Sequence, residues 1–269
     1  MLNLLTLSFA EYLQFRNELS GIHTQDVRNE FVGYMRSGGF PVLHVSEYDE
    51  DTAWKVVYDI YSSIILRDVV QRTGIRDIEL LERVIKFLFD NIGSRFSAAN
   101  VAAYFKSQQR RIDLNTVYNY INALESAYII YRVPRFDVKG REILKTLEKC
   151  YVGDTGLIHA VMGYRDRSIS GLLENIVMLE LKRRGYDVFT GRSEEREIDF
   201  IARKGEESIY IQVSFRMEAQ STIDREFTPL MEIRDHYPKY VVTMDNVWRD
   251  NYEGIKHIHI ADFLLADFY

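Results

Sequence analysis

Apolar residues recur at every third or fourth position along the first 76 residues, which is the spacing of helices with one buried face. The first of these helices is predicted to follow Ser8, and Glu11 three positions later completes a capping box. Runs at 26–38 and 51–73 continue the spacing, and a glycine follows or closes each run. We therefore expect a helical lead-in over residues 1–76.

The pattern over residues 77–152 predicts three shorter helices followed by two strands. The third helix, at 113–127, is expected to share one apolar face made of Leu114, Val117, Tyr118, Ile121 and Leu124. The first strand is interrupted by Pro134, and a charged stretch separates it from the second strand. Three helices and a hairpin in this order are typical of a winged helix-turn-helix, although a plain packing module has the same order.

Helices and strands alternate over the last hundred residues. A helix at 170–184 is followed by predicted strands at 186–190, 197–203 and 208–214. The remaining predicted elements are a helix at 221–235, strands at 239–243 and 256–260, and a closing helix at 261–268. The predicted fold class is therefore α/β (α+β), with a third domain at 153–269 after the segments 1–76 and 77–152.

Composition narrows the class of protein. The content of hydrophobic residues is 46%, which indicates an ordinary globular core. The single cysteine, Cys150, excludes an intramolecular disulfide and fits a reducing compartment. No signal peptide and no membrane-spanning run is predicted, so we expect a cytoplasmic protein with no membrane partner. The sequence does not indicate an oligomeric state.

Charge is unevenly distributed along the chain. The formal net charge is -6, yet residues 101–149 contain nine Lys and Arg against five Asp and Glu. Within the predicted winged helix, amide and hydroxyl groups of the third helix are candidates to contact bases or phosphates of DNA, and basic residues of the hairpin are candidates to contact phosphates. These candidates are Asn115, Thr116, Asn119, Asn122, Arg132, Arg135, Lys139, Arg141 and Lys145. A solvated basic face, or a dock for an acidic partner, remains the alternative.

A second candidate site lies between Gly171 and Ser214. Glu174 is on the predicted helix at 170–184, Asp199 is on the strand "EIDF", and Gln212 closes the strand "YIQVS". This order resembles the core of the PD-(D/E)XK nuclease superfamily, whose acidic or amide side chains hold a divalent metal. The resemblance implies Glu174, Asp199 and Gln212 as ligands of Mg²⁺, a cation that prefers oxygen ligands. The superfamily's lysine corresponds here to Ser214, which carries no charge, so the resemblance implies the fold more strongly than the activity.

The chain as a whole resembles a bacterial and archaeal family in which an N-terminal AAA-type P-loop ATPase precedes a C-terminal domain of unknown function. The resemblance rests on an ordered series of segments: "LTLSFAEYL", "GGFP", "IILRDVV", "TVYNYINALESAYIIYRVPRFD", "KCYVGDTGL", "LLENIVMLELKRRGYDV", "EIDFIA" and "YIQVS". No G-x-x-x-x-G-K-[ST] motif occurs, so no nucleotide cofactor and no ATPase activity are assigned to this chain. The resemblance implies an ATPase domain as a partner in a longer parent protein.

These observations leave three hypotheses for function. The first is a module that binds DNA or a partner and carries a degenerate nuclease-like domain. The second is a Mg²⁺-dependent nuclease that cleaves phosphodiester bonds with Glu174, Asp199 and Gln212. The third is a platform for protein interactions.

Overall fold

The computed structural model describes residues 5–20, 26–45, 48–140, 142–163, 169–193, 196–246, 251–267 and 269. The chain forms two compact units. Unit 1 comprises Met1–Arg132 and Lys149–Ser168, and unit 2 comprises Val133–Glu148 and Ile169–Tyr269. Two long strands, β2 (Ile130–Asp137) and β3 (Glu142–Val152), contribute residues to both units.

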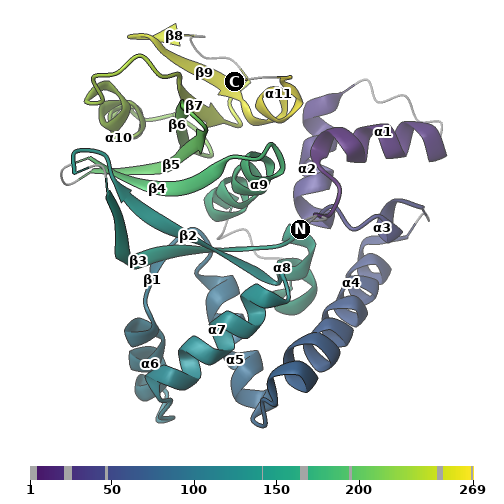
Figure 1. The fold of residues 1–269 in the computed structure, drawn as a ribbon. Helices are drawn as coiled ribbons and strands as arrows, with labels where there is room; N and C mark the ends of the chain where they lie inside the picture. Colours follow the sequence, from purple (N-terminus) through teal and green to yellow (C-terminus); the bar gives the residue numbers. More distant parts are fainter. Residues whose placement is uncertain are drawn as a thin grey trace. The chain divides into compact units, whose positions relative to one another are not determined.

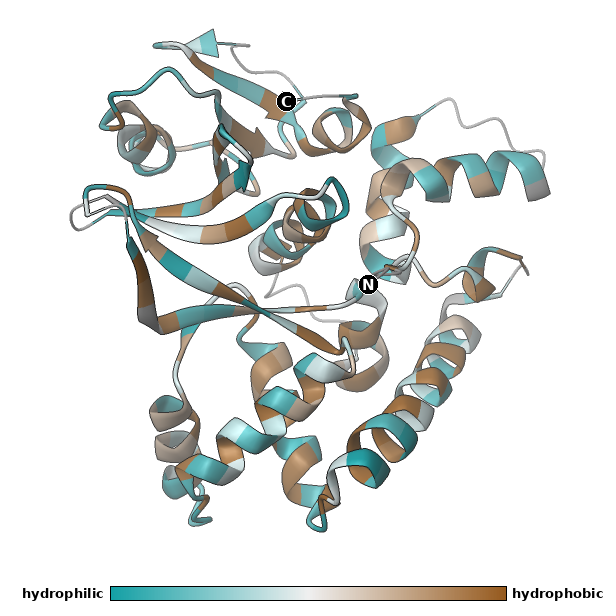
Figure 2. Ribbon diagram, in the orientation of Figure 1, coloured by the Kyte–Doolittle hydropathy of each residue, from teal (hydrophilic) through white to brown (hydrophobic). Residues whose placement is uncertain are grey.

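Unit 1 is mainly helical (Figure 1). Its elements are α1 (Phe9–Ser20), α2 (Val27–Ser37), α3 (Val42–Val45), α4 (Glu50–Ile64), the π-helical segment η1 (Ile65–Gln71), α5 (Ile78–Asp90), β1 (Arg95–Phe96), α6 (Ala98–Ser107), α7 (Leu114–Ser126) and α8 (Thr155–Met162). In Figure 2, hydrophobic and hydrophilic residues alternate along α4 and α7, as expected for helices with one buried face.

Side-chain caps explain where several of these helices begin. The predicted capping box is confirmed, because the Ser8 amide donates to Glu11 Oε2 at 2.7 Å and the Glu11 amide donates to Ser8 Oγ at 3.1 Å. The helix predicted over 51–73 is in fact two segments, α4 and η1. It also begins earlier than predicted, because Asp49 accepts the Thr52 amide and caps α4.

A buried aspartate joins two distant parts of unit 1. Asp154 caps α8 by accepting the Gly156 amide at 2.8 Å, and its other oxygen accepts the Gly39 amide at 2.8 Å. The loop after α2 passes so close to α8 that a Cβ atom on Gly38 would lie 1.9 Å from Asp154 Oδ1 and 2.7 Å from the Gly156 amide nitrogen. The segments "GGFP" and "KCYVGDTGL" therefore contact each other, and their glycines permit the close approach.

Unit 2 consists of a mixed sheet with helices packed on it. Its other elements are α9 (Ile169–Arg183), β4 (Asp187–Ser193), β5 (Arg196–Lys204), β6 (Glu207–Val213), α10 (Gln220–Met231), β7 (Lys239–Thr243), β8 (Asn251–Tyr252), β9 (Ile255–His259) and α11 (Ile260–Leu265). The strand order is β2-β4-β5-β6-β7-β9-β8, with β3 beside β2. The pairs β4–β5, β5–β6 and β8–β9 are antiparallel, and the pairs β2–β4, β6–β7 and β7–β9 are parallel.

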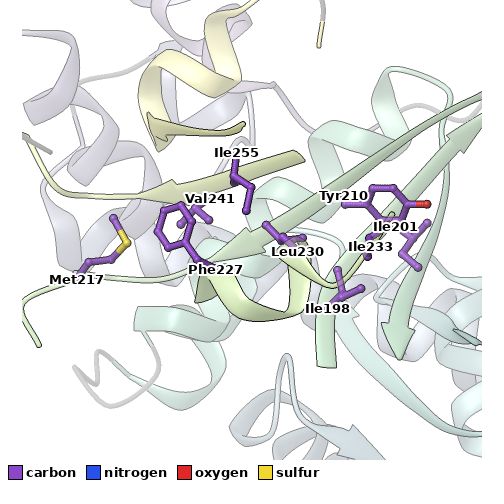
Figure 3. Packing of buried hydrophobic residues seen from close by; sticks show 9 residues of the cluster. All are labelled: Ile198, Ile201, Tyr210, Met217, Phe227, Leu230, Ile233, Val241 and Ile255. Carbon is purple, nitrogen blue, oxygen red and sulfur yellow. The ribbon is translucent and has the colours of Figure 1, made fainter. Parts of the chain in front are cut away.

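The helices of unit 2 cover both faces of the sheet. Helices α9 and α11 lie on one side of the strands and α10 lies on the other (Figure 1). Beneath α10, Phe227 and Leu230 pack onto apolar side chains of the sheet such as Val241 (Figure 3). Burial of this apolar surface holds α10 in place and so fixes the polar residues that the helix carries.

The predicted α/β (α+β) class is confirmed, since helices pack on a mixed sheet. The strands predicted at 197–203 and 208–214 are β5 and β6, which pair antiparallel, and α9 packs on the same sheet. The interruption predicted at Pro134 is wrong, because β2 runs through it. Pairing of β2 with β4 begins at Arg135, so the missing amide hydrogen of Pro134 is not needed there.

Candidate functional site

Asp199 and Gln212 lie side by side where the ladder between β5 and β6 ends. The last paired residues in that direction are Phe200 and Ile211. One residue farther, side chains replace the backbone ladder: the Asp199 amide donates to Gln212 Oε1 at 2.6 Å, and the Val213 amide donates to Asp199 Oδ2 at 3.0 Å. The structure therefore brings two of the predicted site residues together through hydrogen bonds to the backbone.

A third polar residue reaches this point from α10. Gln212 Nε2 donates to Glu226 Oε2 at 3.2 Å, and both side chains are almost completely buried, at 4% and 3% exposure. Glu226 also accepts two hydrogen bonds from Arg225, at 2.6 and 2.9 Å, and a hydrogen bond from the Ser214 side chain. We call Asp199, Gln212, Ser214 and Glu226 the carboxylate network.

Burial dominates the electrostatics of Glu226. Loss of hydration raises the pKa of Glu226 above its ordinary value, and the nearby Asp199 carboxylate raises it further. Hydrogen bonds from Arg225 and Ser214 act in the opposite direction. Most of the Arg225 side chain is exposed to water, so its ion pair with Glu226 offsets only part of the cost of burying the charge.

Glu226 is the residue of this site that the sequence prediction missed. Ile223, Phe227 and Leu230 form the apolar stripe of α10, and Glu226 lies three residues after the first and four before the last. A glutamate on that stripe must be buried, and a buried acid requires partners. The position of Glu226 within the apolar spacing of this helix is the sequence signal that identifies it as a buried acid.

Glu174, the third predicted ligand, lies on a helix rather than on the sheet. It is half-buried on α9, between the buried residues Leu173 and Asn175. Among the residues that the structure describes, no group of three or more His, Cys, Asp or Glu side chains is arranged to hold a metal ion. Glu174, Asp199 and Glu226 therefore do not form an all-carboxylate metal centre.

Helix α7 exposes the amides that the sequence singled out. Asn115, Asn119 and Asn122 are exposed, and Thr116 is half-buried. The predicted apolar face of this helix is partly wrong, because Leu114 and Tyr118 are 45% and 50% exposed. The buried face instead consists of Val117, Tyr120, Ile121, Ala123 and Leu124. That shift places Leu114 and Tyr118 on the same outer surface as the asparagines.

The basic candidates differ in their availability to a phosphate. Arg132 donates from Nε to Glu125 Oε2 at 2.9 Å and from Nη2 to Asn122 at 3.2 Å. Arg135 was a candidate to contact phosphate. It is buried, with 5% of its surface exposed, so its guanidinium is not presented to solvent. Lys139 is exposed in the turn between β2 and β3, which Asp137 stabilises by accepting the Lys139 amide.

The remaining predicted contacts cannot be placed in this way. Arg141 and the side chain of Lys145 lie outside the described residues. Two exposed basic residues near α7 that were not chosen as candidates, Lys106 and Arg111, lie on α6 and in the loop that follows it.

Within the described residues, no helix is both long enough and apolar enough to cross a membrane.

Comparison with known proteins finds relatives that extend over most of this chain. An uncharacterized protein of Haemophilus influenzae is 34% identical over 96% of the chain and 63% of its own length. The uncharacterized protein MJ1544 of Methanocaldococcus jannaschii is 28% identical over 80% of the chain and 49% of its own length. The uncharacterized protein Rv2008c of Mycobacterium tuberculosis is 29% identical over 56% of the chain. The chain thus spans about half to two thirds of the length of the first two relatives.

No solved structure matches this chain. The family model described as "Domain of unknown function (DUF8612)" matches residues 28–168. The matched region begins in α2 and ends at the last residue of unit 1, so it excludes α9 and the carboxylate network. Because the match covers more than half of the 269 residues, this chain belongs to the DUF8612 family.

Proposed function

We propose that this chain is a DNA-binding module whose nuclease-like unit does not cleave phosphodiester bonds. The absence of cleavage is inferred from the carboxylate network, in which the polar atoms of Asp199, Gln212 and Glu226 bond to one another and to the backbone. DNA binding is supported by the exposed asparagine side chains of α7. The two halves are tested by separate experiments.

The order of elements supports a winged helix-turn-helix over residues 77–152. Helices α5, α6 and α7 are followed by the β2–β3 hairpin, and the short strand β1 neighbours β3. In this motif the third helix enters the major groove. Asn115 and Asn119 are suited to that position, since an asparagine amide can form two hydrogen bonds with adenine.

The number of exposed cations sets how strongly such binding depends on salt. Helix α7 itself contains no Lys or Arg. With Arg132 paired and Arg135 buried, the exposed candidates are Lys106, Arg111 and Lys139. Three phosphate contacts correspond to a log–log slope of affinity against salt of about -2.7.

We therefore expect duplex DNA affinity to fall roughly fortyfold between 50 and 200 mM NaCl, as measured by fluorescence anisotropy. Lys106→Glu with Arg111→Glu should abolish binding at 50 mM. A matched control is Lys55→Glu with Arg67→Glu, which changes the charge equally at two exposed positions on α4 and η1. Absence of binding by the wild type, or equal loss in the control, would contradict DNA recognition and favour docking of an acidic partner.

The residues of the nuclease-like site do not suit Mg²⁺. Asp199 Oδ2 and Gln212 Oε1 each accept a backbone amide, so a cation would compete with these hydrogen bonds for both oxygens. Gln212 presents its amide nitrogen to Glu226, and a nitrogen that donates a hydrogen bond cannot be a ligand. Ser214 supplies no positive charge, and its side chain is bonded to Glu226.

One observation favours the nuclease as a second candidate. The Asp199 carboxylate is close enough to raise the pKa of Glu226, as a neighbouring carboxylate does in metal sites. A divalent cation would need to displace Gln212 from Glu226 and both backbone amides from their acceptors. Cleavage that depends on Asp199 would establish this alternative.

We also propose an ATPase domain as a partner, on the basis of the resemblance to AAA-type ATPases. Such a domain would supply the Walker A motif that this chain lacks. Relatives longer than this chain offer the direct comparison, since the Haemophilus influenzae protein has additional length outside the matched region.

A further inference from the structure

A cavity in unit 1 has the composition of a small-molecule site. Its volume is about 300 Å³, and α5, α6 and α8 provide its walls. This volume is at the lower end of the range for ligand pockets, about 300–1,000 Å³. The residues that define its chemistry are Arg83, Lys86, Phe87 and Asp90 on α5, Tyr104 on α6 and Met162 on α8.

Two aromatic rings form one wall of the cavity. Phe87 and Tyr104 have ring centroids 4.8 Å apart and are tilted by 46°. The edge of Tyr104 also contacts the buried ring of Phe105, at 5.4 Å and 86°, which supports it from within the unit. Tyr104 nevertheless remains 45% exposed. A supported but accessible ring is suited to stacking against a planar ligand.

Cations lie one helical turn apart beside these rings. Arg83 forms an exposed ion pair with Glu79, at 2.8 Å, which offsets part of its charge. Lys86 is exposed, and none of the described residues forms an ion pair with it. Asp90, four residues after Lys86, is an acidic residue of the lining. The anionic part of a ligand is therefore expected beside Lys86, away from Asp90.

We propose that this cavity binds a single nucleotide, with the base stacked on Tyr104 and in edge contact with Phe87, and with the phosphate bound by Lys86 beside Arg83. Every nucleobase has a π-face, so stacking on an aromatic ring accepts any base. Lysine and arginine are the side chains that bind phosphate. Met162 adds a flexible apolar surface that adjusts to the shape of a ligand. This proposal is independent of duplex recognition by α7.

The test is titration of the full chain with AMP by isothermal titration calorimetry, together with a 5′-phosphorylated single-stranded DNA decamer. Saturable binding of AMP is expected, and Tyr104→Leu or Lys86→Gln should each weaken it at least tenfold. Tyr104→Phe, which retains the ring, should bind as the wild type does. Binding of the decamer but not of AMP would overturn the assignment to a single nucleotide and would favour an unstacked base of a single strand as the ligand.

Two control variants separate the cavity from the general surface. Tyr58→Leu removes a tyrosine of α4 that is also 45% exposed, and Lys55→Gln removes an exposed lysine of α4 that does not line the cavity. Both should bind AMP as the wild type does, and thermal unfolding should show that every variant is folded. The proposal would be overturned if the wild type bound neither probe, or if the control variants weakened AMP binding as much as Tyr104→Leu does.

Discussion

Replacement of Asp154 by alanine is expected to lower the free energy of unfolding of unit 1 by about 3 kcal/mol or more. The carboxylate is almost fully buried and accepts the Gly39 and Gly156 amides, each at 2.8 Å. Without it, two buried donors lose their acceptor, at a cost of about 1–3 kcal/mol each. The loop after α2 would also lose its hydrogen bond to the start of α8. Urea unfolding followed by circular dichroism measures the change.

Asp113 provides a matched control for this prediction. It caps α7 as Asp154 caps α8, by accepting the amide two residues ahead, at 2.9 Å from Asn115. Asp113 is exposed, so Asp113→Ala should cost only the usual value of an N-cap, about 1 kcal/mol. If Asp154→Ala costs no more than Asp113→Ala, the proposed join between the Gly39 loop and α8 does not contribute to stability.

In the carboxylate network, substitutions on the two sides of one hydrogen bond are expected to have opposite effects. Gln212→Leu leaves the Asp199 amide without its acceptor and removes a donor from the buried Glu226. We expect it to destabilise unit 2 by roughly 2–4 kcal/mol at pH 7, the cost of leaving two buried polar groups unsatisfied. Glu226→Gln should instead stabilise unit 2 at pH 7, because it removes a buried charge while retaining a side chain that can form hydrogen bonds.

The pH dependence of Glu226→Gln follows from the direction of the pKa shift. Burial raises the pKa of Glu226 in the folded chain above its ordinary value, so the folded state retains the proton at pH values where the unfolded state has lost it. Stability of the wild type therefore falls as the pH rises from about 4.5 through the pKa of the folded state. The advantage of Glu226→Gln should be present at pH 7 and absent at pH 4.

Asp224→Asn is the control for that measurement, since Asp224 is an exposed acid on the same helix. It should change stability little at either pH, because exposed ion pairs and hydrogen bonds contribute little. Urea unfolding of the wild type and both variants at pH 4 and pH 7 gives the comparison. An advantage of Glu226→Gln that is equal at both pH values would contradict the role assigned to the buried charge.

Local patterns predicted many elements of this fold well. The capping box of Ser8 and Glu11 marks α1, and short runs rich in apolar residues mark the buried strands β5 and β6. The side-chain contacts of Asp199 and Gln212 also follow from two strands that pair antiparallel. These features depend on neighbours in sequence or on one hairpin, which is why a sequence pattern contains them.

Features that depend on packing between distant elements were predicted less well. Arg135 is on a strand with basic neighbours, and only the assembled structure shows that it is buried. Tyr118 matches an apolar spacing, but the helices that pack on α7 contact a face rotated away from it. Glu226 becomes part of a site only because α10 packs over the end of β6. The spacing of apolar residues predicts that a helix has a buried face more reliably than it predicts which element covers that face.

The network also supports the proposal that the nuclease-like unit does not cleave phosphodiester bonds. In the superfamily that this region resembles, a lysine corresponds to Ser214, and Gln212 would offer a metal an oxygen without charge. Both residues form hydrogen bonds with Glu226. The side chains that the resemblance assigns to a metal and a phosphate are therefore bonded to an acid on α10.

The most direct test of this central claim is a cleavage assay of the wild type and Asp199→Ala on duplex DNA, single-stranded DNA and RNA, each with Mg²⁺ and with Mn²⁺. We predict no metal-dependent cleavage by the wild type, because loss of one preorganised catalytic group alone reduces a rate by roughly 10²–10³ and here two are replaced. Metal-dependent cleavage by the wild type that disappears in Asp199→Ala would contradict the account and establish the nuclease.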